Sequence, residues 1–136
     1  AVNTIAAFAQ AMSIPVQMDF MSLSSYGSGT ESSGTITVRQ DLSTDVRGRH
    51  VLIVEDVVDS GLSMQFLMRQ FEARGARSLR LAALVDKNER REVDVRVDFA
   101  GFKLEEGFIV GYGLDYAEKY RALPDVEELV FESAGD

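Results

Sequence analysis

Residues 51–63 read VLIVEDVVDSGLS, and this stretch decides the fold. Its first four residues are apolar and mostly β-branched, which predicts a strand covered on both faces, as in a parallel sheet. Apolar residues then recur at helical spacing over 64–71, and Gly75 is placed to end that helix. Residues 79–85 form a second apolar run, so residues 51–85 predict a βαβ unit.

Polar and small residues come where the first of these strands turns into the helix. Ligands of open α/β sheets bind at the carboxyl ends of the strands. Small residues within 60–63 allow backbone N–H groups to close around a phosphate at the helix N-terminus. The carboxylates of Glu55 and Asp56 suit sugar hydroxyls or a divalent cation. The simpler alternative is that Asp59 or Ser60 only caps the helix and that the acidic pair is exposed to solvent. We expect capping as well, but the density of polar residues favours a phosphate and sugar site over capping alone.

Further elements are expected on both sides of this unit. A helix carrying Ile5, Phe8 and Met12 ends at residues 13–15, and it begins so close to residue 1 that we expect the chain to start partway through a larger domain. The remaining expectations are strands over 16–24, 34–40, 97–102, 108–110 and 126–131, a polar connection over 41–50 and a helical turn over 116–121.

Residues 24–34 are dominated by Ser and Gly and cannot form core. A flexible linker is one interpretation. Strand-like segments flank this stretch closely, however, and a long loop inside a compact domain more often serves as a lid. We therefore expect a flexible lid loop over 24–34.

Length and charge narrow the function classes. The 136 residues make one domain, 1–136, and 14 Lys and Arg against 22 Asp and Glu give a formal charge of −8, which disfavours nucleic acid as a partner. With no cysteine and one histidine, a metal is left with carboxylate ligands, which suit Mg²⁺, Ca²⁺ or Mn²⁺.

No apolar run approaches the ~20 residues that span a bilayer, and no signal-peptide pattern opens the chain. We expect no membrane partner and a cytoplasmic location.

The run from Val51 to Asp56 also resembles the first strand of response-regulator receiver domains, in which an acidic pair holds magnesium. Its placement argues against this class. A receiver domain starts with that strand, whereas fifty residues precede it here. The Asp59-Ser60-Gly61 turn also has no role in a receiver domain.

Residues 51–63 more closely resemble the signature of type I phosphoribosyltransferases, which bind 5-phosphoribosyl-1-diphosphate (PRPP). Four further segments in the same order narrow the resemblance to hypoxanthine-guanine phosphoribosyltransferases: Ser24–Gly27, Leu84–Lys87, Arg90–Val93 and above all Phe108–Arg121 (FIVGYGLDYAEKYR). The resemblance covers nearly the whole chain. It implies an α/β, type I phosphoribosyltransferase fold with a central, mainly parallel sheet flanked by helices and a flexible hood or lid loop.

The resemblance also implies roles in binding PRPP. Asp59 would be the acid/base group at N7 of the purine. Glu55 and Asp56 would bind the ribose hydroxyls and a metal. The 5′-phosphate would be cradled by Ser60, Gly61, Leu62 and Ser63.

Residues outside this signature receive roles from the same resemblance. Lys87 would donate to the 6-oxo group of the purine, Phe108 would stack on the base, and Ile109 would read its edge through the backbone. The remaining implied roles are a second magnesium on Asp115, a pyrophosphate contact from Arg121, and a place on the lid for Ser25 and Tyr26.

The implied reaction belongs to purine salvage: the 5-phosphoribosyl group of PRPP moves to N9 of hypoxanthine or guanine, giving IMP or GMP and pyrophosphate, with Mg²⁺ as cofactor. The implied partners are the 6-oxopurine base, PRPP and further copies of the chain in a homodimer or homotetramer. A lysine at the 6-oxo position is chemically apt, because its ammonium only donates and would face an amino group in adenine.

The chain departs from the family at its start. The family normally begins with a strand and a Lys-Gly loop that contacts pyrophosphate, and residues 1–136 contain no match to it. We therefore expect an N-terminally incomplete domain with reduced or absent turnover. Two alternatives stay open: a phosphoribosyltransferase for another base such as xanthine, and a phosphoribosyltransferase-like regulator that binds nucleotide without catalysis.

Overall fold

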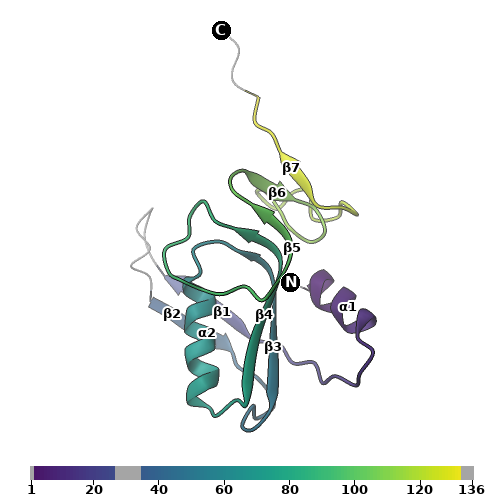
Figure 1. Cartoon of the computed structure of the whole chain (residues 1–136). Coiled ribbons are helices and arrows are strands. Elements are labelled where there is room, and N and C mark those ends of the chain that lie inside the picture. Colours follow the sequence, from purple (N-terminus) through teal and green to yellow (C-terminus); the bar gives the residue numbers. More distant parts are fainter. Residues whose placement is uncertain (1, 27–34, 133–136) are drawn as a thin grey trace.

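The computed structural model describes residues 2–26 and 35–132, and within these ranges it contains two helices and seven strands (Figure 1). In chain order they are α1 (Val2–Ala11), β1 (Ser22–Tyr26), β2 (Thr35–Gln40), β3 (His50–Val58), α2 (Leu62–Ala73), β4 (Ser78–Lys87), β5 (Phe99–Leu104), β6 (Phe108–Val110) and β7 (Glu127–Leu129). Most of the expected lid, residues 27–34, lies outside the described residues.

The central sheet is parallel and has the order β3-β4-β5. Its register pairs His50 with Ser78 at one end and Val58 with Asp86 at the other. β5 lies on the far side of β4, with Leu104 opposite Lys87. The carboxyl ends of β3, β4 and β5 therefore meet at one edge, and the predicted βαβ unit and parallel α/β sheet are confirmed.

The two helices lie on opposite sides of this sheet, as Figure 1 shows. The helix α2 buries Met64, Leu67 and Phe71 against Leu81 and other residues of one sheet face. On the other face α1 contacts β3 and lies near Leu84. Since successive side chains of a strand point to opposite faces, the odd-numbered residues of β4 form the main core and Leu84 points away from it.

The strand β3 is longer than predicted and less completely covered. It continues to Val58, so Glu55 and Asp56 lie within the strand rather than after it. The side chain of Leu52 is 37% exposed, so the prediction of a strand buried on both faces is wrong at this position. Leu52 lines an apolar groove of about 930 Å³ between α1, residues 14–21 and the sheet.

Two antiparallel hairpins, β1-β2 and β6-β7, complete the fold. The strand expected over 16–24 begins only at Ser22. Upstream of it, the carboxylate of Asp19 accepts hydrogen bonds from the backbone and hydroxyl groups of Ser43 and Thr44, which ties residues 19–20 to a loop instead of a sheet. The strand expected over 97–102 begins at Phe99, because Asp98 instead accepts the backbone N–H of Leu81 (2.9 Å).

The helical turn expected over 116–121 is wrong. Ala117 and Glu118 have φ angles of 50° and 63°, and a right-handed helix requires negative values. They form a tight turn closed by hydrogen bonds between Tyr116 and Lys119. The carboxylate of Asp115 accepts the N–H of Glu118 (2.8 Å) and supports this turn.

Among residues 2–26 and 35–132, no helix has the length and apolar character needed to cross a membrane.

Candidate functional site

The turn between β3 and α2 leaves the start of the helix without a side-chain cap. Gly61 occupies the N-cap position in the left-handed region (φ 84°), and no side-chain hydrogen bond caps the helix. The Ser60 hydroxyl accepts only the N–H of Leu62, at 3.3 Å. Of the two candidate caps, Ser60 therefore meets one N–H group of the first helical turn, and within the described residues no hydrogen bond of the Asp59 side chain does so. An uncapped helix N-terminus favours an anion, because its backbone N–H groups and dipole face outward.

A loop packs directly over this turn. We call residues 88–95, which connect β4 to the segment before β5, the strap. The carbonyl of Ser60 accepts the N–H groups of Glu92 (2.9 Å) and Val93 (3.4 Å) from the strap. A Cβ atom on Gly61 would lie 3.2 Å from Arg91 Cδ and 3.2 Å from the methyl groups of Val93 and Val95. Glycine is thus required at position 61 by both its backbone angle and its neighbours.

Asp59 sits under the strap with an unmet hydrogen-bonding capacity. Its Oδ1 atom is buried and has no hydrogen-bond partner within the described ranges. Leaving a buried carboxylate oxygen unsatisfied costs about 1–3 kcal/mol, and such groups in native proteins call for an explanation. A substrate proton donor would satisfy this oxygen.

Lys87 ends the neighbouring strand and is buried, with its side chain 10% exposed. Val58 pairs with Asp86, so the residues that follow them, Asp59 and Lys87, lie at the same edge of the sheet. The ammonium of Lys87 lies 3.5 Å from the exposed carboxylate of Glu89. A buried lysine and the Asp59 carboxylate thus share one edge of the sheet, and convergent polar groups of this kind are typical of a ligand site.

Glu55 and Asp56 form a strongly interacting acidic pair. Burial, together with the hydrogen bond and negative charge of Asp56, raises the pKa of Glu55 to about 8. The pKa of Asp56 is lowered: burial opposes this, but hydrogen bonds from Glu55 and from the N–H of Val57 outweigh it. The two carboxyl groups therefore interact strongly enough to shift their pKa values in opposite directions.

This pair offers the chemistry that a hard divalent cation requires, since it presents only carboxylate oxygens in a crowded, negatively charged position. In the part of the chain that the structure describes, no three His, Asp or Glu side chains gather into a preformed metal site. Asp115 lies apart from the pair and instead forms an ion pair with Arg121 (3.2 Å). Glu55 and Asp56 thus fit one Mg²⁺ ion that substrate oxygens would complete.

The remaining predicted site residues lie on the C-terminal hairpin and on β1. Phe108 lies on β6 and is 40% exposed. Its ring packs edge-to-face against the ring of Tyr116, with 5.4 Å between the ring centroids. Ile109 pairs with Glu128 of β7. Arg121 donates to the carbonyl of Gly113 (3.0 Å) and is half-exposed. Within the described residues, no hydrogen bond or ring contact joins Phe108 or Ile109 to Lys87. Ser25 and Tyr26 end β1, opposite Ile36 and Thr35.

Sequence reasoning missed the importance of Arg91. The segment Arg90–Val93 contributed to the resemblance but received no role, and a charged residue in a loop carries no local signal of burial. In the structure its side chain is 18% exposed, and its guanidinium group bonds to the residue that follows β3 and to the end of β4. Only the packing of the strap over residues 59–61 reveals this.

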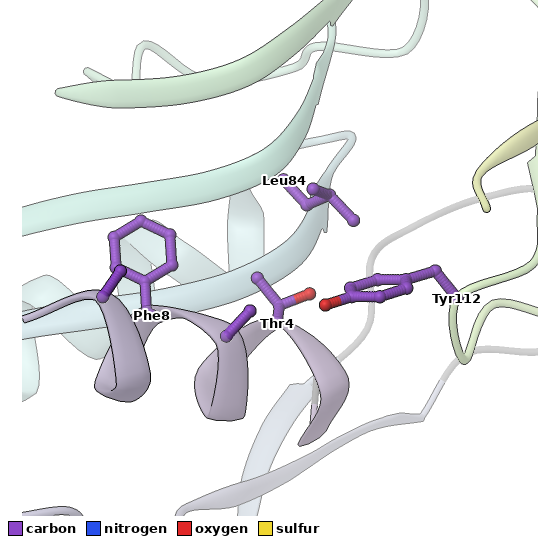
Figure 2. A pocket seen from close by; sticks show the side chains of 6 residues that line it. Thr4, Phe8, Leu84 and Tyr112 are labelled. Carbon is purple, nitrogen blue, oxygen red and sulfur yellow. The ribbon is translucent and has the colours of Figure 1, made fainter. Parts of the chain in front are cut away.

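Two mainly apolar hollows lie next to α1. The groove beneath α1 is lined by Glu55 but mainly by apolar side chains. A smaller cavity of about 290 Å³ lies between α1, β4 and the turn after β6, and Figure 2 shows Thr4 and Tyr112 facing one another across it, with Phe8 and Leu84 nearby. Both are apolar, so the polar groups that could perform chemistry are those at the ends of β3 and β4.

The fold and this edge define a phosphoribosyltransferase-type domain, and comparison with known proteins agrees. The model of the phosphoribosyl transferase domain family matches residues 2–117, and the chain belongs to this family.

Relatives within the family are hypoxanthine-guanine phosphoribosyltransferases. The protein of that name from Bacillus subtilis is 48% identical over 121 residues, covering 87% of this chain and 67% of its own length. The one from Mycobacterium avium is 48% identical over 123 residues, covering 90% and 61%. A crystal structure of a hypoxanthine phosphoribosyltransferase from Staphylococcus aureus superimposes with a TM-score of 0.89 at 34% identity, covering 95% and 70%. The chain thus spans about two-thirds of the length of these relatives, and the expected type I phosphoribosyltransferase fold is confirmed.

Proposed function

We propose that this chain carries the nucleotide site of a hypoxanthine-guanine phosphoribosyltransferase of purine salvage. The reaction moves the 5-phosphoribosyl group of PRPP to N9 of hypoxanthine or guanine and releases pyrophosphate. The observation that carries the proposal is the buried Oδ1 of Asp59, which has no hydrogen-bond partner among the described residues and lies at the same sheet edge as Lys87. The names of relatives nearly half identical to the chain support the same reaction.

Each polar group at the edge has a use in this reaction. The carboxylate of Asp59 accepts the N7 proton of the base while N9 bonds to ribose C1′ and the bond from C1′ to pyrophosphate breaks. Lys87 donates to the 6-oxo group and thereby selects against a 6-amino group. Residues Ser60–Ser63 hold the 5′-phosphate on the uncapped start of α2.

The acidic pair and the C-terminal hairpin complete the proposed site. Glu55 and Asp56 would bind the ribose hydroxyls and would hold Mg²⁺, which would neutralise charge on the pyrophosphate. Phe108 and Ile109 would contact the base. Arg121 would meet the pyrophosphate, and Asp115, which forms an ion pair with Arg121 here, would hold a second Mg²⁺. Ser25 and Tyr26 belong to the lid over 24–34. A cytoplasmic location and a homodimer or homotetramer belong to the same proposal and rest on the resemblance.

Product binding tests this proposal most directly, because GMP and IMP require only the phosphate and base positions. We expect Mg²⁺ with GMP or IMP to raise the thermal unfolding midpoint, since a ligand at 100 times its Kd adds about 2.7 kcal/mol of stability. AMP and UMP should produce no comparable shift. A shift with AMP equal to that with GMP would refute the role of Lys87, and no shift with any nucleotide would refute the proposed site.

Turnover then separates an enzyme from a regulator. Release of pyrophosphate from PRPP that depends on guanine or hypoxanthine supports the transferase. Binding of GMP without any such release would instead assign the chain to a nucleotide-binding regulator.

A further inference from the structure

We infer that Arg91 of the strap is a positioning residue that sets the distance between Asp59 and Lys87. This inference rests on the proposed function, in which those two residues act on the same purine base. Arg91 itself touches neither substrate in this assignment, and it acts through the backbone of its neighbours.

The contacts of Arg91 reach both strand ends at once. Its Nε donates to the carbonyl of Asp59 (2.9 Å), and its Nη2 donates to the carbonyl of Lys87 (3.2 Å) and to the carboxylate of Asp86. Longer contacts of 3.4 Å reach the carbonyls of Val58 and Val95. The single planar guanidinium group therefore joins the residue after β3, the last residues of β4, and Val95 at the end of the strap.

The geometry of a purine explains why this link matters. N7 and the 6-oxo group lie on one edge of a rigid bicyclic ring, so the groups that contact them must keep a constant separation. Asp59 and Lys87 come from different strands, and Asp59 lies beyond the last paired residue of β3. Their spacing is therefore not set by strand pairing alone, and the guanidinium supplies the missing constraint.

Arginine suits this task and lysine does not. The guanidinium is planar and directs its donors in a rigid fork, whereas an ammonium on a flexible stem contacts fewer acceptors at defined angles. A misplacement of about 1 Å between reacting groups can lower a rate by about 10²-fold. Arg91→Lys keeps the positive charge, but it should allow the distance between Asp59 and Lys87 to vary.

The chain contains a matched control for this substitution. Arg74, at the other end of α2, makes a bidentate ion pair with Asp41 through bonds of 2.8 Å and 3.0 Å. Arg74→Lys removes a comparable fork from a place remote from Asp59 and Lys87. An effect on activity that both variants share would come from losing an arginine–aspartate ion pair in general, and not from the position of Arg91.

The first test compares product formation by the 136-residue chain and the two variants, at protein concentrations high enough to measure the reduced turnover expected of the parent chain. If the parent chain shows no turnover, the exchange test below decides the inference. We expect Arg91→Lys to lower kcat about 10²-fold while the KM for PRPP changes by less than about threefold, because the phosphate cradle is left in place. Arg74→Lys should stay within about twofold of the parent chain. Millimolar guanidinium should restore part of the activity of Arg91→Ala. Equal activities of the two lysine variants would overturn the inference.

The second test does not depend on the proposed function. Amide hydrogen exchange should accelerate in residues 58–61 and 86–88 in Arg91→Lys and remain unchanged there in Arg74→Lys. Unchanged exchange at both strand ends, or faster exchange spread over the whole chain, would show that Arg91 does not set their spacing. A parent chain that binds no nucleotide would refute the proposed function, while the exchange result would still decide whether Arg91 joins the strand ends.

Discussion

Gly61→Ala should be the most informative single change in the chain, because it strains the backbone and disturbs the strap at once. Gly61 has φ 84°, and an alanine forced into the left-handed region costs about 1 kcal/mol. The new methyl group would also lie 3.2 Å from atoms of Arg91, Val93 and Val95, and overpacking of this kind costs about 1–3 kcal/mol. We expect a loss of about 2–4 kcal/mol in the free energy of unfolding.

Gly48→Ala separates the two contributions. Gly48 has φ 72°, and a methyl group added there would meet no heavy atom within 4 Å, so alanine should incur only the backbone cost of about 1 kcal/mol. Urea unfolding of both variants gives the difference, provided that the m-value is unchanged. At roughly 4 °C per kcal/mol, thermal midpoints should fall by about 4 °C in Gly48→Ala and by about 8–16 °C in Gly61→Ala.

Binding provides an independent readout of the same change. A displaced strap moves Arg91 and the turn at residues 59–61, so GMP affinity should fall at least about tenfold in Gly61→Ala, or about 1.4 kcal/mol. In Gly48→Ala it should not change. If the two variants agree within about 0.5 kcal/mol in stability, the strap does not resist the methyl group and the packing argument is refuted.

Three further changes test the acid/base group, the core and the acid stability of the fold. Asp59→Asn should lower turnover by about 10²- to 10⁴-fold while GMP still binds, which initial rates and a binding isotherm would check. Leu81 is fully buried, so Leu81→Ala should cost about 2–5 kcal/mol in urea unfolding, and the partly exposed Leu52→Ala should cost clearly less. The pKa of Asp19 is lowered from 3.8 to about 2 by hydrogen bonds. The largest contribution comes from the Thr44 hydroxyl, followed by the N–H groups of Phe20 and Thr44 and by Ser43. Because the folded pKa is depressed, its contribution to stability is complete above pH 3.8 and lost as the pH falls towards 2, so Asp19→Asn should flatten the dependence of the urea midpoint on pH in that window.

The sequence predicted the elements whose signal is local. The apolar run beginning at Val51, the helical spacing over 64–71 and the second run at 79–85 appear as β3, α2 and β4. Gly75, with φ 83°, follows α2 as expected. These features are determined by side-chain periodicity and by one residue's backbone preference, and both can be seen in a short window.

The errors have a common physical origin in contacts between distant residues. The start of β1 depends on Asp19 binding residues 43–44, and the start of β5 depends on Asp98 binding Leu81. Neither contact can be inferred from neighbouring sequence. Leu52 likewise lines the groove beneath α1, and an apolar pattern does not reveal such a groove.

The polar residues of the candidate site divide in the same way. The cluster from Glu55 to Ser63 stands out because carboxylates and small residues rarely follow an apolar strand together, and Lys87 was found only through the resemblance to a family. Arg91 was not found at all, although it links these two strand ends. Its role depends on the fold of the strap, and the same charge in an exposed loop would have no such effect.

The strap also explains how an acidic chain can present a site for anions. With a net charge of −8 the overall field repels phosphate, so binding must come from nearby groups with directed hydrogen bonds. The uncapped start of α2 supplies neutral donors, and their direction is maintained because the carbonyl of Ser60 is bonded to Glu92 and Val93 of the strap. Arg91 directs its charge to Asp86 and to carbonyl groups, so it organises the edge without competing for the phosphate. Substitutions in the strap should therefore change the orientation of these N–H donors and lower the reaction rate. They should have little effect on the overall electrostatic attraction of the substrate.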